Sequence, residues 1–163
     1  MLEALGNLGD FIGGIAVIVT LIYLAVQVRQ NTAALETASR QQIVAGFRDY
    51  NRLNFEPGVD EAIRAGVRSY PDMPAQQRDL FTAFVNDHAL FLQGAFALHE
   101  AGTLEDETYL AYLNFFCAWM STPGGAAWWG EISPLYPPRM VAAINARIAE
   151  GGLPDLVPVL TRE

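Results

Sequence analysis

The sequence predicts an all-α protein, in which a single N-terminal transmembrane helix continues into a small cytoplasmic helical bundle. Three observations predict this fold class. Residues 11–28 form an uncharged, apolar run near the start of the chain. Beyond it, apolar residues recur with helical period and no segment alternates as a half-buried strand would. Proline and glycine then divide the chain into helix-sized segments.

The apolar run has the length of a membrane span. It lies between Asp10 and Arg29, and at 1.5 Å per residue a helix of this length reaches about 27 Å, close to the roughly 30 Å of a bilayer core. It is apolar on every face, whereas a helix that lies on a soluble core needs only one apolar stripe. A cleaved signal peptide is the less favoured alternative, because the residues before the run are acidic rather than basic.

The arginines around the run predict its orientation. None precedes it, and Arg29, Arg40, Arg48 and Arg52 follow it. The positive-inside rule therefore places the N-terminus outside and the remainder in the cytoplasm. We expect a short extracytoplasmic N-terminus, a transmembrane helix, a helical extension and a cytoplasmic helical domain, over residues 1–10, 11–28, 29–56 and 57–163 respectively.

Capping residues divide the domain into further helices. Pro57 and Gly58 end the extension, and Gly102 closes the longest domain helix as a C-terminal cap. Thr103 is then expected to cap the next helix and Thr122 the one after it. The predicted helices cover about residues 59–69, 75–101, 104–121 and 139–150. A further short helix begins at Pro123 and carries Trp128 and Trp129, and an extended tail follows the last helix.

Composition limits the partners. The net charge of −8 repels nucleic acid and anionic lipid headgroups, so we expect no nucleic-acid partner. The single cysteine, Cys117, excludes an intramolecular disulfide and is expected to be a small core residue.

A stripe of small residues follows the first helix at spacings of three and four. Such a stripe lets two helix backbones approach closely, and Gly-x-x-x-Gly is its minimal form. It is the predicted helix-packing interface, for self-association or for docking onto another membrane subunit, and its residues are Gly6, Gly9, Gly13, Ala16, Thr20 and Gln27. Small residues are also common in spanning helices without any such role.

The two histidines, His88 and His99, both fall on the predicted helix 75–101. They lie about 16 Å apart along a helix, too far to share a metal ion. No metal site or cofactor is therefore predicted. We expect His88 to be a hydrogen-bonded core residue, and a catalytic base, pH sensor or haem ligand remains the alternative.

Aromatic residues concentrate late in the sequence and are expected to form the core. The adjacent pair Trp128 and Trp129 is an exception, because neighbouring helical positions point in different directions. One of the two is expected to reach a partner or the membrane surface.

Two motifs carry a resemblance. The first is the entry from Gly9 through the apolar run to Gln27-Val28-Arg29-Gln30-Asn31-Thr32, and the second is Pro123-Gly124-Gly125-Ala126-Ala127-Trp128-Trp129. Together they resemble an uncharacterised family of small bacterial single-pass membrane proteins. The resemblance implies a bacterial inner-membrane location and supplies no activity, cofactor or catalytic residue.

The favoured function is therefore that of a membrane-anchored interaction protein, a homo-oligomer or an accessory subunit of a larger membrane complex, whose partners are the lipid bilayer and itself or other membrane subunits. No catalytic motif is evident, so an enzyme is the less favoured class. One alternative is a helical domain that binds a hydrophobic ligand or performs chemistry around His88 and His99. Another is a small oligomeric channel lined by Thr20 and Gln27.

Overall fold

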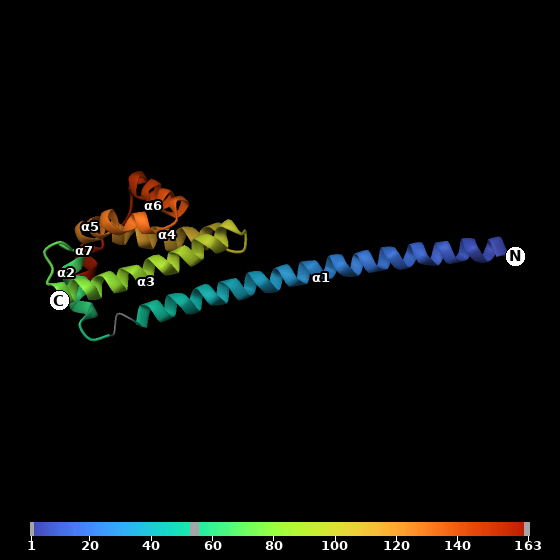
Figure 1. Cartoon of the computed structure of the whole chain (residues 1–163), viewed down its shortest axis with the longest axis horizontal. Helices are drawn as coiled ribbons and strands as arrows, with labels where there is room; N and C mark the ends of the chain where they lie inside the picture. Colours follow the sequence, from blue (N-terminus) through green and yellow to red (C-terminus); the bar gives the residue numbers. More distant parts are fainter. Residues whose placement is uncertain (1, 53–55, 162–163) are drawn as a thin grey trace. The chain divides into compact units, whose positions relative to one another are not determined.

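The computed structural model describes residues 2–52 and 56–161, and for residues 2–10 and residue 40 it describes the backbone alone. All regular structure within these ranges is helical, which confirms the predicted all-α class (Figure 1). The elements in chain order are α1 (Leu2–Arg52), α2 (Val59–Gly66), α3 (Ala75–Glu100), α4 (Asp106–Met120), α5 (Pro123–Ile132), the 3-10 turn η2 (Ser133–Leu135), α6 (Pro138–Glu150) and α7 (Val157–Leu160).

The chain divides into two compact units, Met1–Ala38 and Ser39–Glu163. In the first unit every described side chain, from residue 11 to residue 38, is exposed. The segment Phe11–Arg52 of α1 is long and apolar enough to cross a membrane.

The last turns of α1 belong to the second unit and pack into its core. Ile43 and Tyr50 are buried, and Phe47 lies between them on the same helix face. The Phe47 ring lies 5.4 Å from that of Phe91 on α3 and 5.3 Å from that of Tyr112 on α4. The end of α1 is therefore part of the bundle rather than a free extension.

The centre of the second unit is α3, which packs against α2 on one side and α4 on the other. Its buried stripe follows the helical period and includes Phe81, Phe84, His88, Leu92 and Ala95. The remaining helices extend this core from α4 to α6, with large fully buried side chains at Phe116, Met120, Trp128, Met140 and Ile144.

The start of α5 is held by its Thr-Pro-Gly-Gly sequence. As predicted, Thr122 is the N-cap, and its hydroxyl oxygen accepts a hydrogen bond from the Gly125 amide at 3.0 Å. Gly124 donates its amide to the Val67 carbonyl at 3.1 Å. A β-carbon at position 124 would lie 1.5 Å from the Gly66 carbonyl oxygen. Glycine is required here because the backbones of α2 and α5 touch.

Two local predictions were wrong. Thr103 does not cap α4, whose N-cap is Glu105; instead, both its hydroxyl and its amide donate to the Leu98 carbonyl and close the end of α3. The tail is not wholly extended, because it contains α7, and Leu153, Leu156 and Leu160 pack on the core. Apolar contacts with the rest of the domain stabilise this short helix, which contains Pro158 in its first turn.

The Gly66–Gly124 contact generates the first prediction. Gly124→Ala should lower the free energy of unfolding by about 3 kcal/mol, because the added methyl group overlaps a backbone carbonyl that cannot rotate away. Urea unfolding of the full chain in an uncharged detergent, followed by tryptophan fluorescence, measures this.

Gly130→Ala is the matched control within the same helix. A β-carbon at Gly130 meets no described atom within 4 Å, so this substitution should stabilise the protein by up to about 1 kcal/mol through helix propensity. Equal effects of the two substitutions would contradict the close approach of α2 and α5.

Candidate functional site

The most unusual polar residue of the core is His88. Its side chain is 1% exposed, and aromatic rings enclose it. The ring centroids of Tyr50, Phe115 and Phe116 lie 4.7, 5.1 and 5.1 Å from that of the imidazole. The Tyr50 hydroxyl lies 3.4 Å from Nδ1. His88 is thus the polar centre of an aromatic cluster that joins α1, α3 and α4.

Burial keeps this imidazole neutral. Desolvation lowers the pKa of His88 to about 3 and raises the pKa of Tyr50 well above its ordinary value, with a smaller contribution from the nearby charge of Asp87. Within the described chain, Nε2 of His88 and Nε1 of Trp119 have no hydrogen-bond partner. His88 was predicted to be a hydrogen-bonded core residue. The side chain is buried, and one of its two ring nitrogens, Nδ1, has a hydrogen-bond partner.

His99 lies apart from His88, near the end of α3. Its Nε2 is 3.0 Å from a carboxylate oxygen of Asp106, and its ring stacks on Tyr109 with centroids 4.1 Å apart. These contacts tie the end of α3 to the start of α4. The structure therefore does not bring the two histidines together. His88 lies in the aromatic cluster of α1, α3 and α4, and His99 lies where the end of α3 meets the start of α4.

The tryptophan pair is buried on both sides. Trp128 is 0% and Trp129 6% exposed, so the expectation that one of them reaches the surface was wrong. Gly124 places α5 directly against α2, and on its other side Trp129 donates its indole N–H to Asn145 of α6 at 2.9 Å. Helices α2, α4 and α6 all contact α5, so Trp128 and Trp129 are both buried although they point in different directions.

The polar groups of the predicted packing stripe form hydrogen bonds within α1. The Thr20 hydroxyl donates to the Ala16 carbonyl at 2.8 Å, and the Gln27 amide donates to the Tyr23 hydroxyl at 2.9 Å. A β-carbon at Gly13 would meet no described atom within 4 Å. Gly6 and Gly9 lie outside the residues whose side chains are described.

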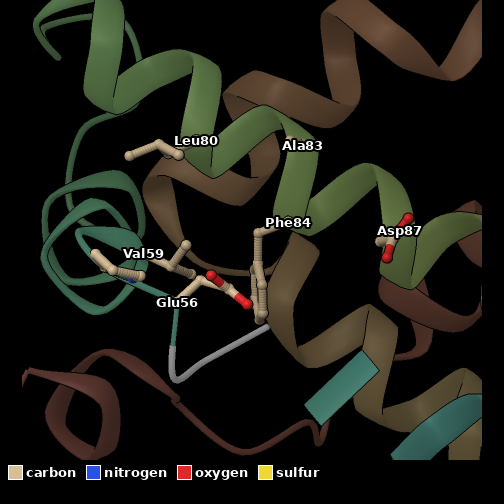
Figure 2. Close-up of a pocket in the computed structure, with 7 residues that line it drawn as sticks. Glu56, Val59, Leu80, Ala83, Phe84 and Asp87 are labelled. Carbon is tan, nitrogen blue, oxygen red and sulfur yellow. The ribbon is translucent and has the colours of Figure 1, made fainter. Parts of the chain in front are cut away.

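A pocket of about 450 Å³ lies between α3 and the residues at and just before the start of α2, and no sequence pattern pointed to it. Figure 2 shows the Glu56 and Phe84 side chains directed toward one another, with Asp87 further along α3. His88 does not line this pocket. Its lining residues are Glu56, Pro57, Val59, Leu80, Ala83, Phe84 and Asp87.

The described residues contain no group of three or more histidine, cysteine or acidic side chains placed to hold a metal ion. Cys117 is fully buried and burial raises the pKa of its thiol to about 12, so it is a core residue rather than a nucleophile. Comparison of the chain with protein-family models, curated proteins and solved structures found no match.

The buried His88 generates a prediction about acid stability. Its pKa is lower in the folded than in the unfolded protein, so the unfolded state binds more protons as the pH falls below about 6.5. Stability is therefore lost on acidification from about pH 6.5 downward, and this residue alone should account for about 2 kcal/mol between pH 7 and pH 5. Urea unfolding at the two pH values measures it.

His88→Phe keeps an aromatic ring in the cluster and removes the titrating group. Its unfolding free energy should change less between pH 7 and pH 5 than that of the wild type, while the carboxylates contribute equally to both proteins. The same pH dependence in both would show that His88 does not bind protons differently in the two states.

Proposed function

We propose that the protein is a membrane-anchored interaction protein, in which residues 11–28 cross the bacterial inner membrane and the helical domain lies in the cytoplasm. Its partners are the lipid bilayer and either a second copy or another membrane subunit. The N-terminus faces outward, because all the arginines near the span follow it.

The exposed apolar surface of α1 carries this proposal. Large aliphatic and aromatic side chains between residues 11 and 28 are each about half exposed or more, among them Phe11 at 66% and Val28 at 63%. Soluble monomers rarely expose contiguous apolar patches of more than several hundred Å². A bilayer covers such a surface on all sides, and a regular helix satisfies its own backbone hydrogen bonds there.

The interaction role is supported by the small-residue face. The side chains of Thr20 and Gln27 form hydrogen bonds within their own helix, so a second helix can pack on the stripe without supplying a polar partner to either residue. Gly13 and Ala16 leave little side-chain volume on the same stripe, which permits close approach of a second helix. The domain itself has a filled aromatic core around His88, which favours a binding role over chemistry at that residue.

Membrane anchoring is tested by extraction. The native protein should sediment with membranes, remain there after alkaline carbonate and be released by mild detergent, because its apolar helix binds lipid independently of charge. Deleting residues 1–28 should move the protein to the soluble fraction. Release of the intact chain by carbonate would contradict the proposal.

The small-residue stripe is tested with neighbouring glycines. Gly13→Leu should weaken self-association, or retention of a co-purifying subunit, by at least about tenfold in mild detergent, because the leucine separates the helices. Gly14→Leu is the matched control, since position 14 lies about 100° around the helix from the stripe. Mass determination of the purified complexes reads out both variants, and equal behaviour of the two would exclude this face as the interface.

A further inference from the structure

We propose that the end segment of α1 (residues 43–52) is a pH-sensitive conformational element: protonation of His88 releases this segment from α3 and α4, while the remaining helices stay packed. All the residues concerned belong to the second compact unit. The inference therefore does not depend on residues 11–28 crossing a membrane.

The end segment packs on the domain through one helix face. Ile43 and Tyr50 are buried on this face, and Phe47 lies between them. Its other faces are open to water, since Val44 is 53% exposed and the Arg52 side chain 74%. By contrast, α4 packs against α3, α5 and α6. The end segment can therefore leave with less disruption than α4, the other helix that packs on the buried imidazole.

The imidazole of His88 lies at the boundary between the end segment and the rest of the core. The ring of Tyr50 covers it from α1, with centroids 4.7 Å apart and the hydroxyl 3.4 Å from Nδ1. From α4 it is contacted by the rings of Phe115, Phe116 and Trp119. Release of the end segment removes the Tyr50 ring and opens one side of the imidazole to water, while the rings of α4 stay in place.

The groups that face the imidazole compensate poorly for a positive charge. Tyr50 is the titratable group among its aromatic neighbours, and burial raises the pKa of this hydroxyl, which keeps it neutral. Asp87 precedes His88 on α3, but its side chain is exposed. Nε2 of His88 has no hydrogen-bond partner among the described residues. A proton on His88 therefore places a charge and an unpaired N–H in an apolar cluster, which is costly.

Release of the end segment removes this cost. In the packed state, burial lowers the pKa of His88 to about 3. Once water reaches the ring, the pKa returns toward its ordinary value of about 6.5. The released state then binds a proton more readily than the packed state, so acidification favours release. Between pH 7 and pH 5 the ratio of released to packed protein should rise by up to about 25-fold, with little further change above pH 7.

Distances between pairs of spin labels test this release. One pair, Arg48→Cys/Leu110→Cys, joins the exposed side of the end segment to α4, and the control pair, Leu90→Cys/Leu110→Cys, joins α3 to α4. Both pairs are placed in a Cys117→Ala/Phe47→Ala chain in uncharged detergent. Loss of the Phe47 ring weakens packing of the end segment, so that the released state becomes measurable.

At pH 5 the 48–110 pair should gain a broad component at longer distance that is smaller at pH 7, and the 90–110 pair should keep its distribution. His88→Phe keeps a ring in the cluster and cannot be protonated, so it should abolish the pH dependence of the 48–110 pair. Unchanged 48–110 distances at pH 5, or the same change in the His88→Phe variant, would overturn the proposal. Broadening of both pairs together would overturn it as well, because the domain would then open as a whole.

Discussion

Aromatic packing at the end of α1 is the interaction on which the rest of the structure depends. Phe47 contacts Phe91 of α3 and Tyr112 of α4, and Tyr50 stacks near Phe84 and His88. Each buried aromatic side chain contributes about 1.5–3 kcal/mol, and these rings come from three different helices. They hold the end of an otherwise exposed helix in the core of the domain and enclose the one buried imidazole.

The same helix therefore meets two environments. From residue 11 to residue 38 its described side chains are exposed, and from Ile43 onward it contributes to the domain core. Helix propensity does not distinguish the exposed part of α1 from the part in the core, because both form regular helix. What separates them is the apolar pattern, which covers every face in residues 11–28 and narrows to the single stripe of Ile43, Phe47 and Tyr50.

Local signals in the sequence were sufficient to predict the longer helices, but not the short α7 in the tail. Proline and glycine between segments, the Thr122 cap and the left-handed Gly102 mark boundaries through backbone chemistry that operates within a few residues. Thr103 was assigned to the wrong helix because a hydroxyl between two helices has a carbonyl behind it and an amide ahead, and both are local partners. The choice between them depends on how the two helices meet.

Features that depend on distant contacts were not predictable. The Gly66–Gly124 approach joins positions far apart in the sequence. Trp128 and Trp129 are both buried because several elements surround α5; Trp129, for example, contacts Phe116 of α4 and Asn145 of α6. Likewise, the pocket brings Glu56 together with residues of α3 that are 24 to 31 positions away along the chain, and neither segment carries a binding motif of its own. The histidines illustrate the limit: their spacing excluded a shared metal ion, but only the packing shows that His88 is enclosed and His99 is at the surface.

Cysteine accessibility along α1 tests most directly whether one helix passes from lipid to protein core. Single cysteines are placed at positions 15, 22, 34, 43 and 44 of a Cys117→Ala chain and labelled with a membrane-impermeant maleimide in sealed inside-out vesicles, whose cytoplasmic face is outward, and again in mild detergent. We expect positions 15 and 22 to be protected in vesicles, position 43 to be protected in both states because the domain buries it, and positions 34 and 44 to react in both. Rapid labelling at 15 and 22 in intact vesicles, equal to that at 34, would contradict the assignment of residues 11–28 to the bilayer.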